Sequence, residues 1–277
     1  MSFPEKNQYQ FINELGRGGT GVVNLAIDQH SGYPVAIKSL FKKHHTEDMI
    51  NKFRIEANIY LMLSHSNIVG LKDFIMDNNG IHLVMEYIDG VTLDYYIKNI
   101  VKGPIPIEVT LAMMKDILSA VGYAHKKNIP IGNYNGVLHL DIKPGNIIIS
   151  KTGDIKIIDY GISQGNKEKR RTKIMCSLMY AAPEQLDLEK TLDEKTDVYA
   201  LGALFHEMIC GDTPFDKTTT QEAMFEKVKE HPLRRIHDIC SDIDPKIQKI
   251  IDKATQKDPD KRYANCDDFM NALEKIS

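Results

Sequence analysis

The 277-residue chain has few cysteines, no long apolar run and almost no excess charge, and each absence excludes a class of protein. Its four cysteines lie 34, 30 and 26 residues apart, which is neither metal-ligand nor redox-motif spacing. No apolar stretch approaches the ~18 residues that a membrane-spanning helix needs. The 35 basic residues nearly balance the 38 acidic ones, so net charge favours neither a nucleic acid nor an anionic membrane as partner.

The sequence also has no internal repeats, no low-complexity tract and no basic-then-apolar signal peptide at its start. Sparse cysteines in a chain of this length are typical of a reducing compartment. We therefore expect a cytoplasmic protein, or the cytoplasmic part of a longer one. A hydrophobic content of 42% is enough for a substantial core.

The segments that are present divide the chain into two parts. Short segments rich in β-branched residues dominate the first 88 residues, and they predict strands over residues 10–15, 21–28, 33–40, 70–76 and 81–87. One helix is predicted there over residues 46–63, with Thr46 as its N-cap. Helical periodicity dominates the remainder, at residues 107–126, 197–210, 220–230, 245–257 and 266–276.

The longest of these helices has a clear apolar repeat. Val109, Met113, Ile117, Val121 and Ala124 recur at spacings of three or four residues. Side chains at this spacing lie on one face of a helix, so we predict an amphipathic helix here.

A glycine-rich segment lies between the first two predicted strands. Residues 15–23 read LGRGGTGVV, which matches the pattern G-x-G-x-x-G-x-V. Glycines allow the backbone to approach phosphate oxygens, and successive N–H groups can then point at negative charge. The motif alone is weak evidence, because a glycine-rich hairpin turn would look the same. A Rossmann fold would need a helix straight after the glycines, whereas a strand is predicted here.

Lys38 ends the apolar strand segment VAIK, and Glu56 lies 18 residues further on, within the predicted helix. A strand lysine paired with a helix glutamate would hold its ammonium group at the α- and β-phosphates of a nucleotide. The alternative for Glu56 is an exposed helix charge.

The strongest local signal is the segment HLDIKPGN at residues 139–146. Asp141 can orient a substrate hydroxyl and accept its proton, and Lys143 can neutralise a transferring phosphoryl group. Asn146 and Asp159, which follows Asp141 by 18 residues, can supply oxygen ligands to Mg²⁺. Aspartate and asparagine are also common in turns, but the joint spacing makes that interpretation improbable.

These motifs, together with APE at residues 182–184, DVYALG at 197–202 and DPDKR at 258–262, resemble the eukaryotic-type (Hanks-type) serine/threonine protein kinase catalytic domain. The resemblance implies an α+β, bilobal protein-kinase fold. Residues 1–88 would form a small antiparallel β lobe with one helix that binds nucleotide. Residues 89–277 would form a larger, mainly helical lobe for catalysis and substrate binding.

The resemblance also implies a reaction. The enzyme would transfer the γ-phosphoryl group of ATP to Ser or Thr hydroxyls of protein substrates and of itself, with Mg²⁺, or Mn²⁺ as a substitute. Lys143 and Ser177 stand where serine/threonine kinases carry their characteristic residues. The implied catalytic residues are Asp141, Lys143, Lys38 and Glu56, and the implied metal ligands are Asn146 and Asp159. The implied nucleotide-binding residues are Leu15, Gly16, Gly18, Gly21, Val23, Ala36, Lys38, Met85, Glu86, Ile88 and Ile148.

Further contacts follow from the same resemblance. Glu184 would pair with a buried Arg262, and Asp197 would hold the backbone of the catalytic loop. Of the ten histidines we expect a role only for His139, whose ring would pack beside Tyr160.

One departure from the family pattern concerns regulation. Leu140 replaces an arginine that in many family members pairs with a phosphorylated activation loop. We therefore expect activity that does not depend on a phosphate at Ser163, Thr172 or Ser177. The basic segment 167–173 in the predicted activation loop is interpreted as a solvated loop rather than a nucleic-acid site.

The main alternative is a pseudokinase that binds nucleotide as a scaffold. Such chains usually lack the equivalent of Lys38, Asp141 or Asp159, and all three are present here. A small-molecule kinase would usually lack the APE segment.

Overall fold

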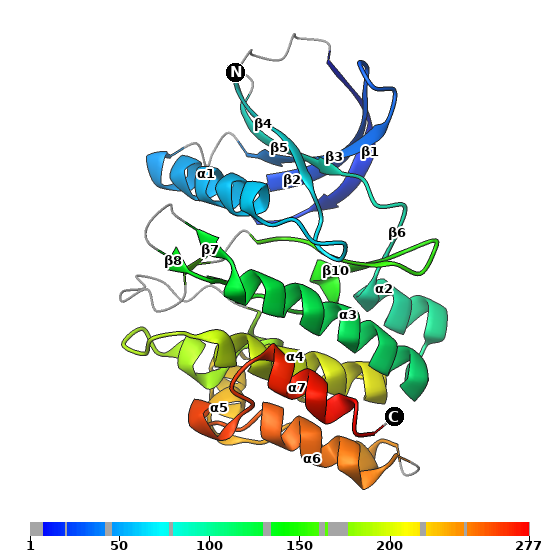
Figure 1. Cartoon of the computed structure of the whole chain (residues 1–277), viewed down its shortest axis with the longest axis vertical. Coiled ribbons are helices and arrows are strands. Elements are labelled where there is room, and N and C mark those ends of the chain that lie inside the picture. Colours follow the sequence, from blue (N-terminus) through cyan, green and yellow to red (C-terminus); the bar gives the residue numbers. More distant parts are fainter. Residues whose placement is uncertain are drawn as a thin grey trace. The chain divides into compact units, whose positions relative to one another are not determined.

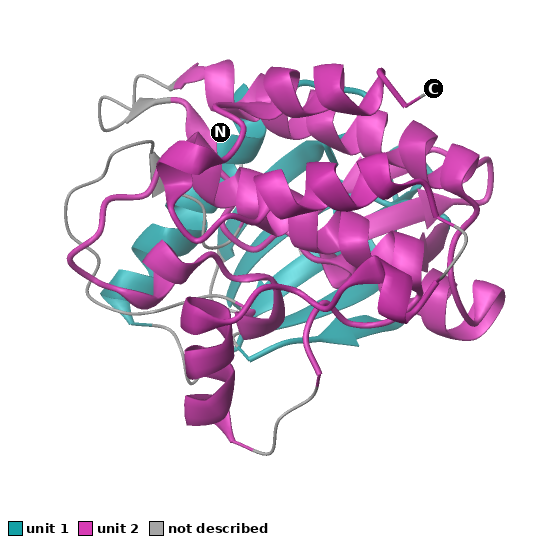
Figure 2. Ribbon diagram, turned by 90° about the horizontal axis from the view of Figure 1, so that it is seen from below, with its two compact units in different colours: residues 1–89 teal, residues 90–277 magenta. Residues whose placement is uncertain are grey.

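The computed structural model describes residues 8–19, 21–41, 46–77, 80–129, 134–160, 164–165, 177–216, 220–240 and 243–276. The chain forms two compact units, residues 1–89 and 90–277 (Figure 2). Their helices and strands are labelled in Figure 1.

The described part of the first unit contains a five-stranded antiparallel sheet in the order β1-β2-β3-β5-β4. Its strands are β1 (Tyr9–Arg17), β2 (Gly21–Asp28), β3 (Pro34–Leu40), β4 (Leu71–Asp77) and β5 (Gly80–Glu86). Side chains alternate between the faces of a strand, and one face buries a cluster made of Ala26, Val35, Ile37, Ile75 and Val84.

The first unit also contains the helix α1 (Glu47–Met62). Its N-cap is Thr46, whose side chain accepts a hydrogen bond from Met49 N at 3.4 Å. Glu47 and Asp48 in the first turn complement the helix dipole. The predicted helix therefore begins where its capping residues indicate.

The second unit is mainly helical. Its longer helices are α3 (Ile107–Lys126), α4 (Glu194–Cys210), α5 (Gln221–Glu230), α6 (Pro245–Ala254) and α7 (Cys266–Leu273). Every residue of α4 from Thr196 to Cys210 is buried, so this helix lies at the centre of the unit. Helix α6 packs closely against α4, because a Cβ added at Gly202 of α4 would lie 2.7 Å from the Cβ of Ala254 of α6.

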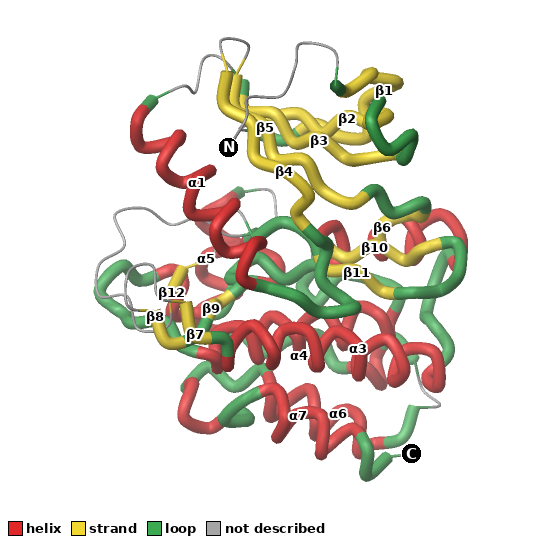
Figure 3. The backbone as a smooth tube through the Cα atoms, turned by 45° about the horizontal axis from the view of Figure 1, so that its top comes forward, coloured by secondary structure: helices red, strands yellow, loops and turns green. Residues whose placement is uncertain are grey.

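Short elements complete the second unit (Figure 3). A small sheet has the order β11-β10-β6, formed by β6 (Gly90–Thr92), β10 (Ile147–Ser150) and β11 (Ile155–Ile157). A helical turn, α2 (Leu93–Tyr95), continues as a π-helix over Tyr96–Val101. The strand pairs are β7 (Asn128–Ile129) with β8 (Tyr134–Asn135), and β9 (Val137–Leu138) with β12 (Gln164–Gly165).

The predicted α+β fold, with an antiparallel sheet and one helix followed by a mainly helical part, is confirmed. The predicted helix over residues 107–126 is confirmed as α3, but not every residue of its apolar repeat is buried. Val109 is 40% exposed, and Met113 is only half-buried, whereas Leu111 and Met114 are buried. Because apolar residues occur on both sides of this helix, the repeat predicts the helix correctly but does not show which apolar side chains of its first half are buried.

Helix ends also differ from the predictions. The structure starts α4 three residues earlier than predicted and ends α6 at Ala254 rather than at residue 257. Within the described ranges, no helix combines the length and apolar character that crossing a membrane requires.

Candidate active site

The register of the first sheet places several predicted nucleotide-binding side chains on one face. Ala36 of β3 pairs with Met85 of β5 and with Leu25 of β2, and Lys38 pairs with Val23. Directly paired residues, and every second residue along a strand, share a face. Val23, Ala36, Lys38 and Met85 therefore lie on the same side, opposite the buried cluster around Val84.

The glycines at the turn between β1 and β2 are required for two different physical reasons. Gly18 N donates to Gly21 O at 2.9 Å between β1 and β2. A Cβ added at Gly16 or Gly18 would meet no atom within 4 Å, so a ligand can approach this backbone closely. At Gly21 a Cβ would lie 2.3 Å from the carbonyl oxygen of Ser39. The packing of β2 on β3 therefore requires Gly21, a reason that the motif did not indicate. Leu15, just before these glycines, is 44% exposed.

Lys38 and Glu56 form the predicted pair between strand and helix. Lys38 Nζ donates to Glu56 Oε1 at 2.8 Å, and the Glu56 side chain is only 3% exposed. The Nζ also lies 5.6 Å from the ring centroid of Phe53. Partners on α1 thus hold the ammonium group on the sheet face that carries Ala36 and Met85.

Three further residues are predicted to bind nucleotide. Glu86 ends β5, where Gly70 N donates to its Oε2 at 3.2 Å, and Ile88 lies in the segment that follows. Ile148 is a half-buried residue of β10 in the second unit, paired with Thr92. Their roles in nucleotide binding stay predictions.

Asp141 is the centre of a hydrogen-bonded cluster in the second unit. Its Oδ2 accepts from Lys143 Nζ at 2.6 Å and from Asn146 Nδ2 at 3.1 Å. Its Oδ1 accepts from Ser177 N at 3.2 Å, and Lys143 Nζ also donates to Ser177 Oγ at 2.8 Å. The structure thus places two predicted site residues, Lys143 and Asn146, around the Asp141 carboxylate and joins them to Ser177 in the segment before APE.

The β10–β11 hairpin brings Asn146 beside the segment that carries Asp159. Ile147 pairs with Ile157, and Ile158 N donates to Asn146 O at 2.9 Å. Asn146 Nδ2 also donates to the carbonyl oxygen of Asp141 at 2.9 Å, so the amide oxygen is the atom that Asn146 can offer to a metal. Asp159 has a φ of 67°, a conformation that costs a non-glycine residue roughly 1 kcal/mol or more.

This donor set fits Mg²⁺ that arrives with a nucleotide. Over the described ranges, no group of three or more His, Cys, Asp or Glu side chains could hold a metal ion by itself. Mg²⁺ is usually bound by one or two protein oxygens together with substrate phosphates and water. Asn146 and Asp159 would supply that number of protein oxygens.

Asp197, buried in the first turns of α4, fixes the backbone just before Asp141. Its Oδ2 accepts from His139 N at 2.7 Å, and its Oδ1 accepts from Leu140 N at 2.8 Å. The predicted role of Asp197 is therefore confirmed. The His139 ring packs beside Tyr160 as predicted, with 4.6 Å between ring centroids.

The prediction that only His139 among the histidines has a role was wrong. His125 Nε2 lies 2.8 Å from Asp197 Oδ2, and its Nδ1 lies 3.8 Å from Cys266 Sγ. Burial opposes a charged His125, but contacts with Cys266 and Asp197 outweigh it and raise the pKa of His125 to about 10. Burial also opposes the Asp197 carboxylate, yet the hydrogen bond and charge of His125 lower its pKa.

His125 and Asp197 therefore form a buried ion pair next to the backbone of His139 and Leu140. The sequence held one signal for it, because His125 stands four residues after Val121 on the buried face of α3.

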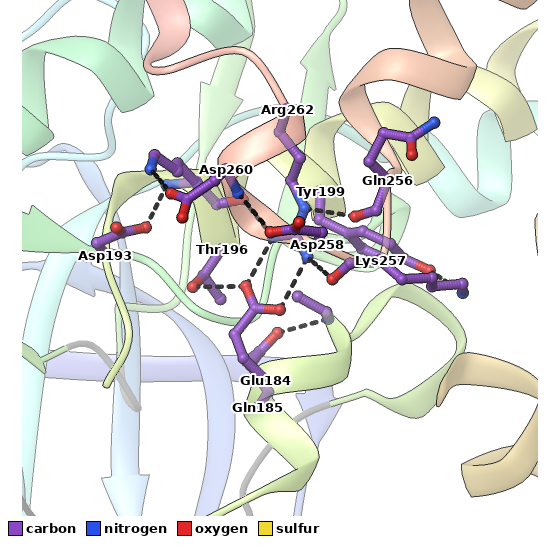
Figure 4. Close-up of polar contacts among 12 residues, drawn as sticks. Glu184, Gln185, Asp193, Thr196, Tyr199, Gln256, Lys257, Asp258, Asp260 and Arg262 are labelled. Carbon is purple, nitrogen blue, oxygen red and sulfur yellow. Dashed lines mark hydrogen bonds and ion pairs between the residues drawn. The ribbon is translucent and has the colours of Figure 1, made fainter. Parts of the chain in front are cut away.

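Glu184 and Arg262 form the predicted buried pair (Figure 4). Arg262 Nη1 and Nη2 donate to the two carboxylate oxygens of Glu184 at 2.7 and 2.8 Å. Thr196 Oγ1 donates to Glu184 at 3.0 Å, and Arg262 donates to the carbonyl oxygens of Lys195 and Gln256. A bidentate pair of this kind fixes direction as well as distance. It joins the APE segment to α4 and to the loop after α6.

The ring of Tyr199, a buried residue of α4, lies next to two cations. Lys257 Nζ lies 5.4 Å and Arg262 Cζ 5.0 Å from its ring centroid. Lys257 Nζ also donates to Tyr199 OH at 3.2 Å and to Val228 O at 2.6 Å. Burial, followed by the charge of Arg262, lowers the pKa of Lys257 to about 8.

Leu140, in place of the family's usual arginine, belongs to an apolar cluster with Leu138 and Leu192. Its side chain is buried and cannot bind an anion. Ser163, Thr172, Cys176 and the basic segment 167–173 lie outside the described residues.

Comparison with known proteins agrees with this geometry. The model of the protein kinase domain matches residues 9–274. The chain therefore belongs to the protein kinase family.

Three curated relatives illustrate the likeness. Over 267 residues the chain is 34% identical to the serine/threonine-protein kinase PrkC of Bacillus subtilis, covering 95% of this chain and 39% of PrkC. It is 32% identical over 275 residues to a probable serine/threonine-protein kinase of Clostridium acetobutylicum, covering 98% of this chain and 40% of that protein. It is 32% identical over 290 residues to the serine/threonine-protein kinase PknB of Mycolicibacterium smegmatis, covering all of this chain and 44% of PknB. The chain thus spans about 40% of the length of these relatives.

Proposed function

We propose that this chain is a serine/threonine protein kinase that transfers the γ-phosphoryl group of ATP to Ser and Thr hydroxyls of proteins, itself included. The observation that carries the proposal is the cluster of Lys143, Asn146 and Ser177 around the Asp141 carboxylate. Phosphoryl transfer needs little covalent chemistry from the protein, so positioning and charge stabilisation by such a cluster provide most of the catalysis.

The proposed roles follow from the contacts. The Asp141 carboxylate orients the substrate hydroxyl and accepts its proton. Lys143 is 28% exposed on its side chain and can stabilise negative charge that develops on the transferring group. Its hydrogen bond to Ser177 joins this cation to the segment where we propose that substrate docks. Lys143 and Ser177 are the residues that resemble those of serine/threonine kinases, which supports Ser and Thr as acceptors.

For the nucleotide, we propose that residues 1–88 supply the binding lobe, through the open backbone of Gly16 and Gly18 and the Lys38–Glu56 pair. Residues 89–277 would supply the catalytic and substrate-binding lobe. Asn146 and Asp159 would hold Mg²⁺, or Mn²⁺ in its place, which neutralises phosphate charge when bound. Sparse cysteines and balanced charge support a cytoplasmic enzyme that acts on proteins rather than on nucleic acids.

A pseudokinase scaffold is the alternative function. The contacts of Lys38 with Glu56 and of Asp141 with Lys143 favour an active enzyme, because both pairs would be expendable in a scaffold.

The test is transfer from radiolabelled MgATP to the chain itself and to casein, followed by phosphoamino-acid analysis. We expect phosphoserine and phosphothreonine, loss of transfer on metal chelation, and a rate at least ~100-fold lower for Lys38→Met. Phosphotyrosine as the main product would contradict the proposed specificity. Binding of MgATP without any transfer would support the scaffold.

A further inference from the structure

Gln185, the residue after APE, bridges two segments that are 45 positions apart. It lies in the short 3-10 helix Pro183–Leu186 and is 3% exposed. Its Oε1 accepts from Ala182 N at 2.9 Å, and its Nε2 donates to the carbonyl oxygen of Leu140 at 2.9 Å. One side-chain amide therefore connects the APE segment to the residue before Asp141.

The carbonyl that Gln185 binds belongs to a backbone segment under strain. Leu140 has a φ of 66°, in the left-handed region that non-glycine residues seldom adopt. Such a conformation persists only where surrounding contacts impose it. Asp197 holds the N–H of Leu140, the apolar cluster with Leu138 and Leu192 holds its side chain, and Gln185 holds its carbonyl.

The Leu140 carbonyl and the Asp141 N–H belong to the same planar peptide group. Gln185 binds the oxygen of this group, and His139 Nδ1 lies 3.3 Å from its nitrogen. The orientation of this plane sets the direction in which the Asp141 side chain leaves the backbone. Loss of the bond to the oxygen would allow this plane to rotate, which changes ψ of Leu140 and φ of Asp141.

We propose that Gln185 is a positioning residue, which sets the direction of Asp141 through the Leu140 peptide. This rests on the proposed kinase function, in which Asp141 acts on the substrate hydroxyl. Because the same amide also accepts from Ala182 N, displacement of the APE segment would move the catalytic carboxylate. Gln185 would thus couple the two segments.

Two substitutions test this. Gln185→Met is similar in size and removes both hydrogen bonds. Gln185→Glu keeps an acceptor for Ala182 N but faces the Leu140 carbonyl with a carboxylate oxygen. Burial raises the pKa of such a carboxyl group, and the protonated form would again donate to Leu140 O.

We expect kcat to fall about 10-fold in Gln185→Met with the KM for ATP unchanged, since positioning losses appear in kcat. In Gln185→Glu, kcat relative to the unsubstituted chain should be similarly low at pH 8 and should rise at least about threefold at pH 6. The Gln185→Met ratio should stay flat over this range. A purely structural role would not produce this difference between the two pH profiles.

The matched control is Gln248→Met on α6. Gln248 Oε1 also accepts from a backbone N–H, that of Ile236 at 2.8 Å, but it contacts neither catalytic segment in the described structure. Its kcat should be unchanged even if its Tm falls. Wild-type kcat in both Gln185 variants, or parallel losses with flat pH ratios, would overturn the proposal. Activity of the unsubstituted chain, measured in the same assay, tests the kinase function separately.

Discussion

At the scale of single residues, the loop at residues 139–146 is held through hydrogen bonds to its backbone, because position 140 has no charged side chain. Leu140 is buried and strained, and Asp197 fixes its N–H. A leucine here cannot bind a phosphorylated activation loop, so we predict that the arrangement around Asp141 is stable without one.

The first prediction concerns activation-loop phosphorylation. Thr172→Ala and Ser163→Ala should each retain kcat within about twofold of the unsubstituted chain, because no arginine at position 140 awaits their phosphates. Initial-rate measurements on dephosphorylated protein would check this. Abolished activity in Thr172→Ala would contradict it.

The second prediction concerns the buried pair of His125 and Asp197. Breaking a buried pair typically costs 3–5 kcal/mol, so His125→Gln should lower the free energy of unfolding by about 3 kcal/mol at pH 6.5. The pKa of His125 is raised to about 10 in the folded chain. Between pH 6.5 and 10 the folded state therefore binds more protons, and the contribution of His125 to stability decreases as pH rises.

The difference between the unsubstituted chain and His125→Gln should accordingly narrow toward pH 10 in urea titrations. His231→Gln, at an exposed histidine, is the control and should show no such change. A difference that is constant with pH would show that His125 is not charged in the folded state.

At the scale of helices and strands, the close contact between α4 and α6 is set by Gly202. A Cβ there would lie 2.7 Å from both Ala254 Cβ and Thr255 Cγ2. Since α4 is the buried centre of the second unit, the spacing of this contact should affect the stability of that unit.

The third prediction follows. Gly202→Ala should lower the free energy of unfolding by about 1–3 kcal/mol, the usual cost of overpacking. Gly103→Ala is the control, because a Cβ there meets no atom within 4 Å, and it should be neutral or slightly stabilising. Thermal unfolding of both variants would measure this. Equal effects at the two positions would contradict the proposed role of the contact.

Elements with local signals were predicted best from the sequence. Thr46 and Thr220 cap α1 and α5, and each side chain accepts a hydrogen bond from the backbone N–H three residues later. These helix starts could therefore be predicted from the capping residue in the sequence. Strands of two to four residues in the second unit are too short to show a period, and the π-helix after α2 has none of the usual signals. These elements depend on tertiary packing.

At the scale of the whole molecule, the site residues that could be predicted are those that belong to one contiguous sequence motif. Asp141, Lys143 and Asn146 are close in sequence, and their spacing implied their chemistry. His125 and Gln185 act on the same loop from 16 positions before and 44 positions after Asp141. The spacing of His125 from Val121 indicated only that it is buried, and no spacing rule indicated Gln185. Their roles emerge only where folding brings their polar atoms to Asp197 and to the Leu140 carbonyl.

We propose that Asp141 serves phosphoryl transfer in this chain. The most direct measurement compares initial rates of transfer from MgATP to a protein acceptor for the unsubstituted chain and Asp141→Asn, with MgATP binding measured on both. We predict that Asp141→Asn binds MgATP normally and transfers at least ~100-fold more slowly. Equal rates for the two proteins, or MgATP binding without transfer by the unsubstituted chain, would contradict the claim.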